Sequence, residues 1–76
     1  MDISKYKSVG EWYEDARKNG YSIPVQMCQG LSELMEKRNL SFQEAYNFLL
    51  DKEKVIIKGK FYFYNLSAPK LWEDEK

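Results

Sequence analysis

Residues 55–64 read VIIKGKFYFY, and this stretch decides the fold class. It is rich in β-branched and aromatic residues with a glycine near its middle, which is typical of two short strands joined by a tight turn. Before it, apolar side chains recur with the 3.6-residue period of helices. The sequence therefore predicts an α+β fold in which three short helices precede a two-stranded antiparallel β-hairpin.

The register of the hairpin depends on the length of its loop. A two-residue loop at residues 58–59 places Val55 opposite Tyr62, whereas a three-residue loop ending in a left-handed Gly59 places Val55 opposite Phe61. The second register is preferred because it gives the second strand a regular alternation, with phenylalanines inward and tyrosines outward. It predicts an exposed face formed by Ile56, Tyr62 and Tyr64.

The first and third helices carry capping signals at their starts. Ser8 with Glu11, and Ser41 with Glu44, have the spacing of a capping box, in which each side chain accepts a hydrogen bond from a backbone N–H at the helix start. Gly20 is placed to end the first helix in a left-handed conformation. The apolar spacing within both segments then puts one stripe of side chains on the core.

The second helix is expected to begin at Pro24, with Ser22 or Ile23 near its cap, and to end at residues 37–39. Gly30 lies inside its apolar stripe, where glycine costs about 1 kcal/mol relative to alanine. Either the helix breaks there or another element packs closely against it, and close packing is preferred.

These elements fill a single small domain of 76 residues. Residues 1–7 form an N-terminal arm that packs down through Ile3 and Tyr6, residues 8–54 the three-helix part, 55–64 the hairpin and 65–76 a short tail. The expected core consists of apolar side chains from every element: Trp12, Tyr13, Ala16, Met27, Leu31, Leu34, Met35, Phe42, Ala45, Tyr46, Leu49, Val55, Phe61 and Phe63.

Composition argues against catalysis. The chain has no histidine, one cysteine, and twelve basic against twelve acidic residues. Without histidine, the common nucleophilic triads and zinc sites cannot be built, and no glycine-rich phosphate loop or calcium-binding spacing is present. Cys28 lies on an apolar helix stripe, which is typical of an inert structural thiol. We therefore expect no enzyme, no cofactor and no metal.

The chain shows no signal for export or membrane insertion. No apolar run follows the N-terminus, and no stretch approaches the roughly 20 apolar residues of a membrane-spanning helix. A lone cysteine fits a reducing compartment. These features predict a soluble cytoplasmic protein without a membrane partner.

A binding module that regulates a partner protein is the preferred function. Twelve aromatic residues in a chain of 76 exceed what so small a core can hide, and exposed aromatic side chains are enriched at protein interfaces. The partner is another protein or a second copy in a homodimer. The predicted contact residues belong to the hairpin and the tail: Ile56, Tyr62, Tyr64, Leu71 and Trp72. The tail could instead fold back and cover this face.

Nucleic-acid binding is the alternative, because the element order is that of a winged helix. The wing lysines would contact phosphate, and they are Lys54, Lys58, Lys60 and Lys70. The exposed positions of the third helix weaken this reading, since Glu44 and Asp51 repel phosphate where a recognition helix needs basic or amide side chains. The other explanation for these lysines is that they lie at the edge of the hairpin and prevent its aggregation.

Overall fold

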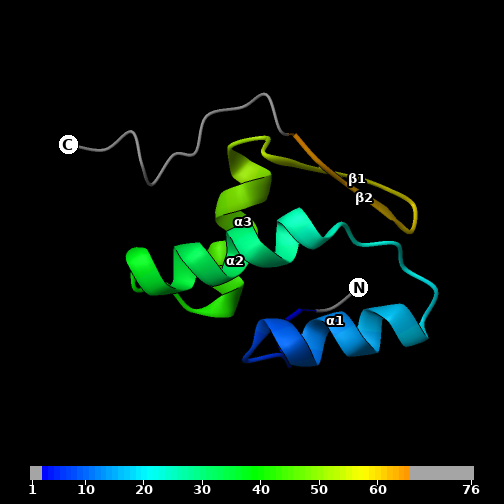
Figure 1. Cartoon of the computed structure of the whole chain (residues 1–76), viewed down its shortest axis with the longest axis horizontal. Helices are drawn as coiled ribbons and strands as arrows, with labels where there is room; N and C mark the ends of the chain where they lie inside the picture. The colour runs from blue at the N-terminus through cyan, green and yellow to red at the C-terminus, as the bar shows by residue number, and fades with distance from the viewer. Residues whose placement is uncertain (1–2, 66–76) are drawn as a thin grey trace.

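A computed structural model describes residues 3–65 and contains the predicted elements in the predicted order (Figure 1). The helices are α1 (Val9–Lys18), α2 (Val25–Lys37) and α3 (Phe42–Asp51), and the strands are β1 (Val55–Lys58) and β2 (Phe61–Tyr64). The strands form one antiparallel hairpin that follows α3 and lies above α2 in the view of Figure 1. The fold is therefore α+β, three helices followed by a β-hairpin.

The helices α1 and α3 begin at the predicted cap residues, Ser8 and Ser41, but the capping of α1 and α2 differs in detail from the prediction. Ser41 and Glu44 form the full capping box, with N···O distances of 3.2 and 2.9 Å. In α1, Ser8 accepts from the Glu11 N–H, but the Glu11 carboxylate accepts from Lys7 rather than from the cap residue. The predicted cap of α2 was wrong by one or two residues, because Pro24 itself, which has no N–H to satisfy, occupies the cap position.

The C-termini of α1 and α3 share one capping motif. Gly20 has φ of +84°, its N–H binds the Arg17 carbonyl and the next N–H binds the Ala16 carbonyl. At the end of α3, Glu53 holds the corresponding position with φ of +59°, and the two bonds to the helix carbonyls are also formed, at 3.1 and 2.9 Å. This is the Schellman arrangement, predicted at Gly20 but not at a glutamate.

The hairpin register differs from both expectations. Val55 pairs with Tyr64, Lys58 pairs with Phe61, and the two turn residues are Gly59 and Lys60. Gly59 has φ of +60° at the first turn position, where a type II′ turn places a glycine. Relative to the preferred register, the partner of Val55 has moved by three positions. An odd shift turns each side chain of β2 to the opposite face.

The predicted core is correct for most of its members. The helix residues and Val55 are buried, or partly buried in the case of Tyr13 and Met35. The expected burial of Phe61 and Phe63 was wrong, because the observed register exposes both side chains to solvent and buries Tyr62 instead. The arm packs down as predicted, with Tyr6 buried and its ring edge-on to Phe42.

Gly30 confirms the expectation of close packing. The α2 helix runs through it without a break, and Gly30 is buried. A Cβ at this position would stand 2.8 Å from the hydroxyl oxygen of Tyr64, at the end of β2. The missing side chain thus lets the hairpin approach the helix backbone.

Candidate interaction surface on the hairpin

Four side chains form the outward surface of the hairpin, here named the outer hairpin face: Ile56, Lys58, Phe61 and Phe63. Ile56 lies directly across from Phe63, and Lys58 lies across from Phe61. The exposed fractions of the three apolar residues are 47% for Ile56, 58% for Phe61 and 51% for Phe63. The two phenylalanine rings stack with centroids 6.4 Å apart and planes 29° from parallel. The hairpin thus presents a continuous aromatic and aliphatic patch with one cation.

Tyr62 holds the opposite face of the hairpin against the helices. Its ring centroid lies 5.7 Å from Trp12, 6.1 Å from Tyr21 and 6.4 Å from Tyr46. Edge-on and tilted contacts of this kind are the favoured arrangements of aromatic pairs. Because Tyr62 is buried between its neighbours, Phe61 and Phe63 must point the other way.

Two backbone hydrogen bonds fix the same strand from its edge. The Ser22 N–H donates to the Lys60 carbonyl at 2.8 Å, and the Tyr62 N–H donates to the Ser22 carbonyl at 3.0 Å. The connection between α1 and α2 therefore pairs with β2 in parallel at a single residue. These bonds position the outer hairpin face without using any of its side chains.

A buried pair of hydroxyl groups completes this anchorage. The Tyr46 and Tyr62 hydroxyl oxygens are 2.9 Å apart. Burial raises the pKa of both phenols above the usual value. Ionisation of either group would place a charge inside the core, so the neutral pair belongs to the folded state.

The predicted protein-binding residues are not all brought together. Ile56 is exposed as predicted, but the exposure assigned to Tyr62 and Tyr64 was wrong. Both side chains point inward with Val55, because the strand pairing differs from the predicted register by three residues. In addition, the Tyr46 hydroxyl in the core is a hydrogen-bond partner for Tyr62. Leu71 and Trp72 lie outside the described residues. Phe61 and Phe63, which were assigned to the core, take the exposed positions.

The wing lysines are also dispersed. Lys54 is only 3% exposed, with its Nζ atom 5.2 Å from the centroid of the Tyr64 ring. The Nζ atom of Lys60 donates to the Asn19 carbonyl at 2.8 Å and lies over the Tyr21 ring. Lys58 is exposed on the outer hairpin face, and Lys70 lies outside the described residues. Lys54, Lys58 and Lys60, the three of these lysines within the described residues, therefore do not form one basic surface.

A second polar cluster ties the arm to α1. The Tyr6 hydroxyl donates to the Asp15 carboxylate, and the Lys5 ammonium lies 3.7 Å from the same oxygen. The hydrogen bond from Tyr6 is the main cause that lowers the pKa of Asp15, and it raises the pKa of Tyr6. The role of both side chains is structural, because the hydrogen bond from Tyr6 to Asp15 attaches the N-terminal arm to α1.

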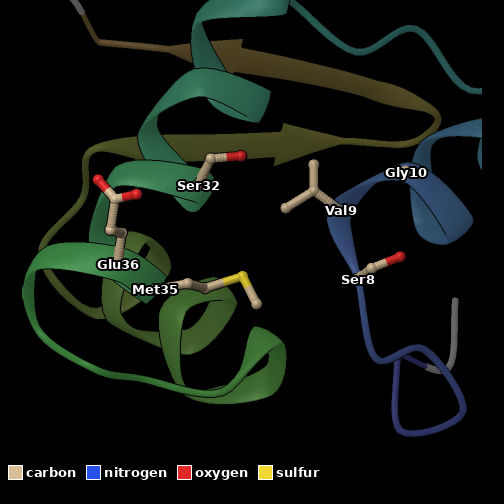
Figure 2. Close-up of a pocket in the computed structure, with 6 residues that line it drawn as sticks. All are labelled: Ser8, Val9, Gly10, Ser32, Met35 and Glu36. Carbon is tan, nitrogen blue, oxygen red and sulfur yellow. The ribbon is translucent and has the colours of Figure 1, made fainter.

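An open groove of about 460 Å³ lies between the start of α1 and the last turns of α2 (Figure 2). Val9 and Met35 extend into it from the two helices, and the carboxylate of Glu36 points away from Val9. Beside it, burial raises the pKa of the Cys28 thiol, which disfavours the reactive thiolate. The polar residues that line the groove are Ser8, Ser32 and Glu36.

Within residues 3–65, no group of three or more metal-ligating side chains gathers, and no helix there has the length and apolar character to cross a bilayer. No family model, no curated protein and no solved structure matches the chain significantly.

Proposed function

We propose that the protein is a small non-enzymatic module that regulates a partner protein by binding it through the outer hairpin face. One observation supports this above all: Ile56, Phe61 and Phe63 form a contiguous apolar patch with each side chain about half exposed. Single exposed hydrophobic residues are ordinary, whereas contiguous patches mark interaction sites.

The size of the patch limits the affinity. Complete burial of one phenylalanine contributes about 1.5–3 kcal/mol, and Phe61, Phe63 and Ile56 are already about half buried. The patch alone therefore supplies less than the roughly 8 kcal/mol of a micromolar complex, so a tighter complex needs further contacts around it. Lys58 at the rim favours a partner that carries an acidic group beside an apolar one.

The test compares three immobilised forms of the protein in one cell lysate: wild type, Phe61→Ser with Phe63→Ser, and Val25→Ser. Val25 is the matched control because it is the large exposed hydrophobic residue of α2, 60% exposed. We expect one protein to be retained by wild type and by the Val25 variant and lost by the double variant. Identical retention by all three forms contradicts the proposal.

Binding of single-stranded nucleic acid is a second candidate, favoured by the stacked pair Phe61 and Phe63 beside Lys58. Bases stack on exposed aromatic rings with little sequence preference, and lysines contact the phosphates. Burial of Lys54 and engagement of Lys60 by Asn19 weaken this candidate.

Fluorescence anisotropy of a labelled oligothymidine at about 50 and 200 mM salt separates the two candidates, because phosphate contacts weaken steeply over this range. Nucleic-acid binding predicts an affinity that falls with salt and is lost in Lys58→Glu but kept in Lys52→Glu, an exposed lysine at the end of α3. Absence of binding at low salt leaves the protein partner as the function.

A further inference from the structure

The groove between α1 and α2 continues along the surface of α2. A second hollow of about 400 Å³ adjoins it, lined by Cys28, Gln29, Ser32 and Glu33. Because Ser32 lines both hollows, they form one surface, here named the α2 groove. The α2 groove follows residues 28–36, a length of about 12 Å at about 1.5 Å per residue, which equals about two turns of a helix.

The walls of the α2 groove are apolar and partly exposed. Val9 and Met35 extend into it from α1 and α2 (Figure 2), and both are only partly buried against the core, as is Cys28. These three side chains therefore still offer apolar surface to a partner. The flexible thioether of methionine adapts to different contact surfaces, which suits a docking groove.

Gly10 keeps one end of the α2 groove open. It lies in the first turn of α1, and a Cβ built there meets no atom of the described residues within 4 Å. Close packing inside the described fold therefore does not explain this glycine, in contrast to Gly30. Glycine is a poorer helix former than alanine, and a partner that approaches α1 closely gains from the space that it leaves.

The charge of the α2 groove selects the chemistry of a partner. Glu33 and Glu36 contribute carboxylates to the lining, and no lysine or arginine is among the described residues that line it. The Glu36 carboxylate points away from Val9 (Figure 2), so it lies at the rim rather than between the apolar walls. Rim charges favour partners of opposite sign. A fitting partner therefore combines an apolar stripe with basic groups beside it.

We propose that the α2 groove binds an amphipathic helix of a partner protein whose apolar stripe is flanked by lysine or arginine residues. An amphipathic helix laid into an apolar groove is a recurrent mode of recognition. The helices α1, α2 and α3 bury their own apolar stripes in the core, so a second copy does not present a free one within the described residues. The α2 groove shares no residue with the outer hairpin face, so this inference holds or fails separately from the proposed function.

Synthetic peptides of about 14 residues test the proposal, because shorter peptides rarely hold a helix in water. One peptide has a leucine stripe flanked by lysines, and its matched control has glutamate at every lysine position. In NMR titrations of the isotope-labelled full chain, only the lysine peptide should shift the amide signals of Gly10, Ser32 and Glu36. Absence of these shifts at about 1 mM peptide, or shifts centred on Phe61 and Phe63, overturns the proposal.

Three variants locate the contact. Gly10→Gln fills the open end of the groove without a clash in the described fold, so it should unfold in urea like the wild type and bind the lysine peptide severalfold more weakly. Glu36→Lys should also weaken binding severalfold. Glu14→Lys, an equal change of charge at an exposed position outside the groove lining, should not. Equal weakening by the two lysine variants, or unchanged binding by Gly10→Gln, overturns the proposal.

Sedimentation distinguishes the source of the bound helix. The wild type and Gly10→Gln should both sediment as monomers. A wild-type dimer that Gly10→Gln dissociates would mean that a second copy occupies the α2 groove, which overturns the proposed partner. If the lysine peptide does not bind while a lysate protein still depends on Phe61 and Phe63, only the present inference fails.

Discussion

The hydroxyl oxygen of Tyr64 occupies the space where the side chain of residue 30 would begin. The distance from that oxygen to an ideal Cβ at Gly30 is 2.8 Å, and two ring carbons lie at 3.3 and 3.4 Å. Helix α2 and strand β2 therefore pack closely at this point, because Gly30 has no side chain and the phenol of Tyr64 fills the space.

Replacing Gly30 by alanine should destabilise the fold despite alanine's better helix propensity. Alanine gains about 1 kcal/mol in a helix interior, while overpacking costs about 1–3 kcal/mol, so we expect a net loss of about 1 kcal/mol. Urea unfolding measures it. In a Tyr64→Phe background the loss should shrink, because the closest atom is gone; equal losses in both backgrounds would show that the close contact is not the cause.

Loss of both hydroxyls of the buried tyrosine pair should cost less than the two single losses added together. Tyr46→Phe leaves the Tyr62 hydroxyl without its buried partner, which costs about 1–2 kcal/mol. The double replacement with Tyr62→Phe removes the donor and the acceptor together, so its cost should be less than the sum of the two single costs. A double-mutant cycle by urea unfolding at pH 7 tests this non-additivity, and additive losses would contradict it.

Stability should decline at alkaline pH. Burial raises the pKa of Tyr46, Tyr62 and Tyr64 in the folded state. Their stabilising contribution is therefore complete below the ordinary phenol pKa of about 10 and is lost as the pH rises above it, because only the unfolded chain ionises readily there. Urea midpoints between about pH 8 and 11 should fall above pH 10, less so in the double phenylalanine variant.

Removing the Tyr6 hydroxyl should raise the pKa of Asp15 toward the ordinary value. The hydrogen bond from Tyr6 is the largest cause of the lowered pKa, ahead of the charge of Lys5. In the folded state this favours the carboxylate, so the contribution to stability is present above the unfolded pKa and lost as the pH falls through the folded one. Carboxyl NMR titration should show a larger pKa change for Tyr6→Phe than for Lys5→Met.

Glycine should be the better residue at the end of α3. Glu53 has a positive φ, which costs an L-residue about 1–2 kcal/mol and costs glycine little. We expect Glu53→Gly to raise the free energy of unfolding by about 1 kcal/mol and Gly20→Ala, at the equivalent position of α1, to lower it by a similar amount. Thermal unfolding of both variants gives the comparison, and a destabilised Glu53→Gly would contradict it.

Helix positions could be predicted from the sequence because their determinants are local. Ser41, Glu44 and Gly20 act through backbone groups within a few residues, and Gly30 is a conspicuous gap in an apolar stripe. The burial of Lys54 had no such signal, since it depends on a positive φ at Glu53 and on the Tyr64 ring across the hairpin.

The faces of the hairpin could not be predicted for a different reason. Phenylalanine and tyrosine alternate along β2, so both faces are aromatic and the pattern alone favours neither. The choice depends on contacts distant in sequence: the Tyr46 hydroxyl for Tyr62, and the Ser22 backbone at the strand edge. The sequence therefore predicted the exposure of Ile56 correctly but exchanged the buried and exposed aromatic residues of β2.

Two backbone hydrogen bonds with Ser22 hold β2 in place. The attachment of the hairpin to the fold therefore depends on other groups than the side chains that it presents to solvent. Its attachment uses peptide groups and the inward Tyr62, whereas the outward side chains contribute little to it. Substitutions of Ile56, Phe61 or Phe63 can then accumulate without loss of the fold. If the outer hairpin face binds a partner as proposed, divergence at these three positions would change which partner is bound while the scaffold stayed intact.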